Sequence, residues 1–302
     1  MENKIAILAL MISGIVWAST AMGYKFFIAA GFSIALIFVV TRFFKMLSVL
    51  AIAKYKDVHR LNIKDSREIF FLLLNALFSL GTPIFFVLAL SYTSLTNVYF
   101  IHYTMPAWVF IAAAIFLGER INAKKIFAVA ATVLGMLLIS NPADIFSVNL
   151  GVIFAFFSAI CFAGDIITAR ELKDYSYHAV SIHSNALQLL MFSAAAIILF
   201  GEKVASFSFD SFVVLAVTGI FLGIASYLYY FAISKIDAST AGVISLSELL
   251  FTFVLGLIVL REMPGMFELF GYSLIALSAL ILLLRKADIE DFENLLLMRK
   301  KH

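Results

Sequence analysis

The chain has 302 residues, of which 63% are hydrophobic and only 14% are charged, and its formal net charge is +3. Soluble domains carry about 25% charged residues, so this composition excludes a water-soluble globule. The single cysteine, Cys161, excludes a disulfide framework and a cysteine-based metal site. We therefore expect an all-α integral membrane protein, without a metal or a cofactor.

Apolar segments long enough to cross a bilayer recur along the whole chain. A transmembrane helix needs about 20 apolar residues to cross a hydrocarbon core about 30 Å thick. The sequence predicts ten such helices: residues 5–24, 30–52, 68–91, 94–117, 123–140, 149–169, 179–200, 211–233, 238–260 and 265–284. The loops between them are short, so little of the chain remains for a soluble domain.

Basic residues divide unequally between the two sides of these segments. With ten crossings both termini lie on one side, and a cytoplasmic N-terminus puts 19 of the 22 Lys and Arg residues on the inner side. That count includes the seven basic residues from Arg42 to Arg67. Because cytoplasmic loops carry the excess of Lys and Arg, we expect both termini in the cytoplasm of a protein in the inner membrane. The positive charge then faces the lipid headgroups and does not indicate nucleic acid.

The chain contains an internal duplication. Residues 89–119 recur without a gap as 232–262, at a constant offset of 143 residues. Identical residues hold equivalent positions: Ala89, Ser91, Phe110, Ile115, Leu117 and Glu119 correspond to Ala232, Ser234, Phe253, Ile258, Leu260 and Glu262. Five segments per repeat is an odd number, so the second repeat enters the membrane inverted. We expect one repeat over 1–140, an inverted repeat over 141–285 and a cytoplasmic tail over 286–302.

Inverted repeats are typical of secondary transporters, in which two similar halves expose a midplane site alternately to each side. A duplicated bundle that serves only as a scaffold is the alternative. Two prolines, Pro83 and Pro106, lie inside predicted helices and are expected to kink them, either for packing or for movement. Gly219 and Gly223, four residues apart, are expected to let helices approach closely.

Short motifs in both halves resemble the drug/metabolite transporter superfamily, specifically its EamA type. They are Gly14-Ile-Val-Trp17-Ala-Ser, Ala89-Leu-Ser-Tyr-Thr with Pro106, Leu-Gly-Glu119-Arg, the stretch from Gly223 to Ile233, Glu248, and Leu-Arg-Glu262. The resemblance implies ten helices around a central cavity, lined by the first, third and fourth helices of each repeat. Where the family usually has Glu-Pro, this chain has Glu248-Leu249, which leaves the kink in that helix open.

Two acids, Asp165 and Glu248, lie well inside predicted helices. A charged side chain at the bilayer centre costs at least about 2.5–3.5 kcal/mol, so each is expected to have a function or a partner. We interpret both as candidates for proton coupling; the alternative is a structural ion pair with His102, His183 or Lys25. Together with other polar and aromatic residues they form the predicted substrate cavity: Trp17, Thr20, His102, Tyr103, Asp165, Tyr227, Ser245 and Glu248.

An acid–base pair ends the same helix of each repeat, at opposite faces of the membrane. Glu119 and Arg120 end the first copy, and Arg261 and Glu262 end the second. These pairs are candidates for gates, with ordinary interfacial anchoring as the alternative.

No motif of a hydrolase, metalloprotease or nucleotide-binding loop occurs, so catalysis and ATP-driven transport are not expected. The prediction is a secondary transporter, an exporter or exchanger of a small metabolite such as an amino acid. Protons are possible partners, and the short loops suit a monomer or a homodimer. A channel or a non-transporting scaffold is the alternative function.

Overall fold

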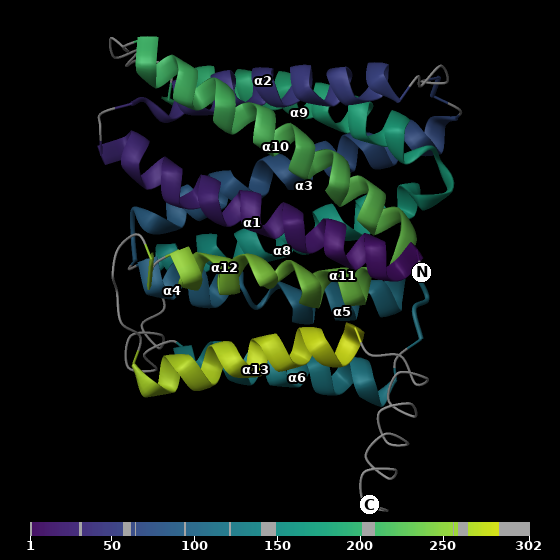
Figure 1. Cartoon of the computed structure of the whole chain (residues 1–302), viewed down its shortest axis with the longest axis vertical. Helices are drawn as coiled ribbons and strands as arrows, with labels where there is room; N and C mark the ends of the chain where they lie inside the picture. Colours follow the sequence, from purple (N-terminus) through teal and green to yellow (C-terminus); the bar gives the residue numbers. More distant parts are fainter. Residues whose placement is uncertain are drawn as a thin grey trace, which may run out of the picture.

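The structure, a computed structural model, describes residues 2–29, 32–56, 62–63, 65–93, 95–120, 122–139, 149–200, 209–255, 257–258 and 265–283. All regular structure in these residues is helical. Figure 1 shows a bundle of long helices with roughly parallel or antiparallel axes, in which α6 and α13 pair at one edge and α2, α9 and α10 lie at the other.

The helices of the first repeat are α1 (Glu2–Ala29), α2 (Ile34–Tyr55), α3 (Ser66–Leu90), α4 (Leu95–His102), α5 (Met105–Phe116) and α6 (Ala123–Ile139). Those of the second are α8 (Leu150–Glu171), the short 3-10 helix η1 (Leu172–Asp174), α9 (Tyr177–Phe200), α10 (Phe209–Lys235), α11 (Ala238–Ser245), α12 (Ser247–Leu255) and α13 (Met266–Leu283). In the described residues, seven helical segments are long and apolar enough to cross a membrane. This shows a multi-pass helical membrane protein, whereas the ten crossings, the inversion and the side of the termini stay predictions.

Polar residues fix where several helices begin. Ser33, Asp65 and Asn149 lie one residue before α2, α3 and α8 in extended backbone conformation. Each side chain accepts a hydrogen bond from the N–H three residues on, at 3.1, 2.8 and 3.1 Å respectively. These caps satisfy amide groups that have no partner within the helix, so the helices begin at defined positions.

Both repeats contain a broken helix at the same position. The predicted helix 94–117 divides into α4 and α5 after His102, and 238–260 divides into α11 and α12 at Leu246. Pro106 accounts for the first break, because proline cannot donate to the carbonyl four residues earlier. The second break forms without proline: the Leu249 N–H donates to the Leu246 carbonyl at 3.0 Å, a short-range bond that tightens the turn.

Glycines mark the closest helix approaches. A Cβ at Gly219 would lie 2.6 Å from the Thr41 carbonyl oxygen, and one at Gly223 would lie 2.5 Å from that of Lys45. Only glycine fits there, so α10 packs directly against the backbone of α2, as the four-residue spacing predicts. Gly14 likewise brings α1 against the break in the second repeat, since its Cβ would lie 2.8 Å from Ser247 Oγ.

Candidate functional site

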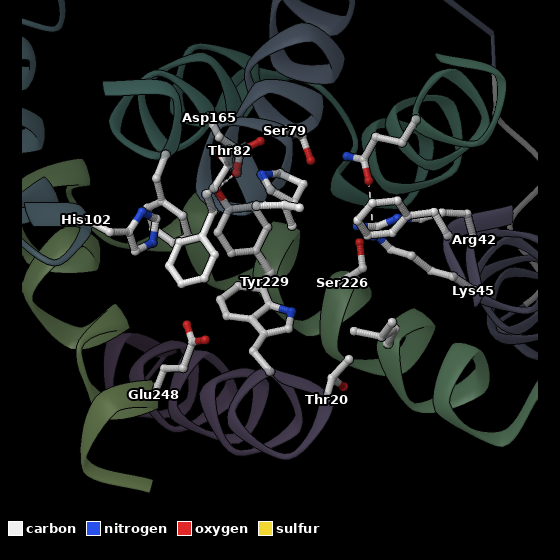
Figure 2. A pocket seen from close by; sticks show the side chains of 18 of the residues that line it. Thr20, Arg42, Lys45, Ser79, Thr82, His102, Asp165, Ser226, Tyr229 and Glu248 are labelled. Atoms are coloured by element: carbon white, nitrogen blue, oxygen red, sulfur yellow. Dashed lines mark hydrogen bonds between the residues drawn. The ribbon is translucent and has the colours of Figure 1, made fainter. Parts of the chain in front are cut away.

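A cavity of about 320 Å³ opens inside the bundle. Its wall comes from eight helices, α1, α2, α3, α4, α8, α9, α10 and α12, together with Tyr103, the residue that follows α4. The cavity therefore includes α2 and α9 besides the helices that the family resemblance implies. The side chains around it are mainly aromatic and aliphatic, with a few polar and charged groups that point inward (Figure 2).

Six of the eight predicted cavity residues lie on this wall. They are Trp17, Thr20, His102, Tyr103, Asp165 and Glu248. Tyr227 and Ser245 lie away from it, which corrects their predicted position. The Tyr227 hydroxyl is hydrogen-bonded to His178 at the start of α9, and Ser245 is 1% exposed at the end of α11. The helical turn of α10 directs Tyr229 and Tyr230 into the cavity instead.

Asp165 is held by two neutral donors. The Tyr229 hydroxyl donates to Asp165 Oδ2 at 2.7 Å, and Asn75 Nδ2 donates to Asp165 Oδ1 at 2.9 Å. In the described residues Asp165 forms no ion pair, so the predicted pairing with His102 or His183 does not occur, while the Lys25 side chain lies outside the described set. Tyr229 and Asn75 come from α10 and α3, so the acid of α8 connects three helices.

His102 is part of a separate hydrogen-bonded group. Its Nδ1 lies 2.9 Å from Ser158 Oγ, and the Ser158 hydroxyl donates to the Thr82 carbonyl at 2.8 Å. Because a hydroxyl has one proton, Nδ1 of His102 is the donor to Ser158. His102 is therefore fixed in orientation rather than paired with an acid.

The Glu248 carboxylate points into the cavity from the first turn of α12 (Figure 2). In the part of the chain that the structure describes, no group donates a hydrogen bond to it. Aromatic rings surround the space it faces: Trp17 meets Tyr229 edge to face at 5.5 Å, and Tyr99 stacks on Tyr103 at 5.6 Å. Such surfaces suit an amphipathic solute, because rings cover its apolar part and a few polar groups fix its orientation.

The inner-side count includes two cavity cations, Arg42 and Lys45, although both fall inside the predicted helix 30–52. They lie within α2 and face the cavity, opposite His102 and Glu248 (Figure 2). Removing both from the inner-side count leaves 17 against 3, so the predicted orientation is unaffected. The signal that identifies them is the one used for Asp165: a charge inside an apolar segment.

Ionic and capping contacts join the repeats at one end of the bundle. Glu119, which follows α5, accepts hydrogen bonds from the Ala238 N–H and the Ser239 hydroxyl at the start of α11, both at 2.5 Å. Lys125 Nζ lies 3.2 Å from Glu119 and 3.0 Å from Asp237. We call this group, Glu119, Lys125, Asp237, Ala238 and Ser239, the Glu119 latch.

The contacts of the Glu119 latch can be compared with the four predicted gate residues. Arg120 is exposed and the partners of Glu119 are Lys125 and α11, whereas Arg261 and Glu262 lie outside the described residues. The cavity wall extends instead to Ile37 and Leu90, at the start of α2 and the end of α3, which lie at the other end of the bundle. The bundle is thus closed at the latch, and the cavity extends away from it.

Long apolar helices around an internal cavity with charged groups are features of a membrane transporter. The model of the EamA-like transporter family matches residues 4–141 and 149–284, so the chain belongs to the EamA-like transporter family. Members of this family are transporters of small solutes rather than enzymes.

A solved structure entitled "Crystal structure of protein" superposes with a TM-score of 0.77 at 15% sequence identity. The match covers 92% of this chain and 98% of that one, and at this identity it shows the fold alone. A search of curated protein sequences finds no significant match.

Proposed function

We propose that the protein is a secondary active transporter that exports or exchanges a small metabolite such as an amino acid across the cytoplasmic membrane. The observation that carries this proposal is the internal cavity, which extends toward one end of the bundle and stops short of the Glu119 latch. A carrier needs such a site with access from one side at a time. A channel would instead need a continuous polar path through the bundle.

The charges on the cavity wall support a substrate that carries both signs. Glu248 faces the cavity without a hydrogen-bond donor among the described residues, and Arg42 and Lys45 lie on the opposite side. Tyr229 lies between them (Figure 2), and the Trp17 ring meets it edge to face. An ammonium group at Glu248, a carboxylate toward α2 and an apolar part against the rings would satisfy each surface, which favours an amino acid over a purely apolar drug.

The internal duplication predicts how the transporter changes conformation. In the alternating-access cycle, the Glu119 latch opens while the equivalent end of the other repeat closes. If the termini are cytoplasmic, the latch closes the cytoplasmic side, because Lys235 at the end of α10 pairs with Glu2 at 3.6 Å near the N-terminus. The structure then corresponds to a conformation that faces outward. Protons are proposed as the coupling ion, carried by Asp165 or Glu248.

Counterflow in proteoliposomes tests the transport function. Purified protein is reconstituted with a mixed pool of unlabelled amino acids inside, and entry of each labelled amino acid is followed. A carrier accumulates label transiently because the internal pool drives exchange, whereas a channel or a scaffold gives no overshoot. The absence of an overshoot with every amino acid, in vesicles that contain folded protein, would contradict the proposed function.

A further inference from the structure

Two basic residues on one face of α2 form the cationic side of the cavity. Arg42 and Lys45 are three residues apart, so their side chains are neighbours on the helix surface, and both line the cavity. Lys45 is only 7% exposed. Two like charges one turn apart repel each other, and each costs at least about 2.5–3.5 kcal/mol at membrane depth. The burial of Lys45 therefore requires acceptors for its ammonium group.

The protein supplies only a neutral contact to the Lys45 ammonium. Lys45 Nζ donates to Gln188 Oε1 at 2.8 Å, and in the described residues no carboxylate lies within 4.0 Å of it. An ammonium has three donors, so one amide oxygen does not complete its hydrogen bonding. The Arg42 guanidinium lies over the Phe192 ring, with its central carbon 4.2 Å from the ring centroid, which orients it on the same helix face.

A chain of hydrogen bonds leads from Lys45 to Asp165. Gln188 Nε2 donates to the Tyr230 hydroxyl at 3.1 Å, and that hydroxyl donates to Asn75 Oδ1 at 2.7 Å. Asn75 Nδ2 donates to Asp165 Oδ1 at 2.9 Å. Every group thus donates toward the acid, and the aligned dipoles favour a cation at one end and an anion at the other. The chain fixes Gln188 and leaves Lys45 with donor capacity for a further acceptor.

The packing of α2 keeps both cations in place. Gly223 of α10 contacts the backbone of Lys45 itself, and Gly219 contacts the turn before it, at Thr41. A site whose charged groups stand on closely packed helices binds with less loss of conformational freedom than one on a loop.

We propose that Arg42 and Lys45 form a subsite for an anionic oxygen group of the transported solute, a carboxylate or a phosphate. An arginine and a lysine side by side are the usual donors for such groups. The anion accepts the donors that Gln188 leaves to Lys45 and lies beside the Arg42 guanidinium. This assignment rests on the proposed transport function for its physiological meaning, but the binding itself can be measured without transport.

The test is ligand binding to the detergent-purified full-length protein, followed by the shift of the thermal midpoint with ligand concentration. The probes are amino acids and 3-phenylpropionate, each compared with its methyl ester, which lacks the carboxylate charge, and inorganic phosphate and phenyl phosphate as the second class of anion. We expect one anion class to bind about 30-fold or more tightly than the ester without the anionic group, because loss of one partner from a buried charge pair has a cost of this size.

Three variants locate the effect. Lys45→Gln should abolish the preference for the anion over its ester, whereas Lys54→Gln, an exposed lysine in the last turn of the same helix, should preserve it. Gln188→Glu is the second test: it places a carboxylate against Lys45, so the variant should stay folded and yet lose the preference. Because Gln188→Glu is expected to fold, its anion preference can be measured even if Lys45→Gln is unstable.

Equal binding of anions and esters by the unchanged protein would overturn the subsite, as would a preference that survives in both Lys45→Gln and Gln188→Glu. No binding of any carboxylate or phosphate would also overturn it, while leaving transport of an amine open to the counterflow assay. Anion binding at Lys45 without counterflow of any probe would contradict the transport function and support the subsite.

Discussion

Replacement of Glu119 by glutamine should open the latched end of the bundle. The Glu119 carboxylate is 12% exposed and accepts from the Ala238 N–H, the Ser239 hydroxyl and Lys125. Glutamine keeps the shape of the side chain but removes its charge. Its amide nitrogen is a hydrogen-bond donor and would face the donor groups of Ala238, Ser239 and Lys125. Hydrogen bonds to a charged group contribute about 1.5–3 kcal/mol each, so we estimate a loss of about 2–4 kcal/mol for the set. The bonds from Ala238 and Ser239 join the two repeats, whereas Lys125 belongs to the same repeat as Glu119. Loss of the two bonds from α11 therefore falls on the closed state.

A loss of that size shifts the ratio of open to closed molecules by about 30-fold or more. The shift can be read as the labelling rate of a cysteine placed at Ala241, which is 0% exposed on α11. A Cys161→Ser background removes the native thiol, and a hydrophilic maleimide added to proteoliposomes reports access. Glu119→Gln should raise the labelling rate of Ala241→Cys, and Arg120→Gln, on the exposed neighbour, should leave it unchanged. The latch would be refuted if folded Glu119→Gln protein were labelled no faster than its parent.

Three further predictions concern other parts of the molecule. Asp165→Asn or Glu248→Gln should remove the pH dependence of transport, and unchanged dependence in both variants would exclude them as proton carriers. Gly135→Ala should lower the free energy of unfolding by about 1–3 kcal/mol, because its Cβ would lie 2.7 Å from a backbone oxygen of α13. The thermal midpoint should fall accordingly, and an unchanged midpoint would show that the helices can separate. Hydrogen bonds from the first turn of α3 and from Tyr175 lower the pKa of Asp65 below 3.8, so its cap is complete above that pH and is lost as the pH falls through the lowered value. Tyr175→Phe should bring the pKa of Asp65 back toward 3.8 in an NMR titration, and an unaltered value would contradict the assigned cause.

The sequence predicts the helices well because hydrophobic length is a local property. Eight of the ten predicted segments coincide with single helices whose described bounds differ by a few residues, and the other two divide into α4 with α5 and α11 with α12. Asp165, inside the predicted helix 149–169, does line the cavity. A buried acid in an apolar segment must face a polar partner or a cavity, so the same reasoning also predicts the position of Glu248.

The residues that sequence reasoning missed depend on helix rotation and on partners far along the chain. Tyr227, Tyr229 and Tyr230 are neighbours in sequence, and only the packing of α10 decides which of them reach the cavity. Lys45 and Gln188 lie 143 residues apart, which is the offset of the internal duplication, but only the packing of α2 against α9 shows that their side chains meet. Arg42 and Lys45 lie inside the predicted helix 30–52, but the sequence does not show which face of that helix meets the cavity.

The break at Leu246 shows that proline is not required to interrupt this helix. Gly14 brings α1 against Ser247, and the tight turn at Leu246 forms although Leu249 stands where the first repeat has Pro106. The second interruption is therefore a property of the surrounding packing, whereas Pro106 accounts for the first. A sequence that lacks the proline at either position can still form two half-helices, so a missing proline does not indicate a continuous helix.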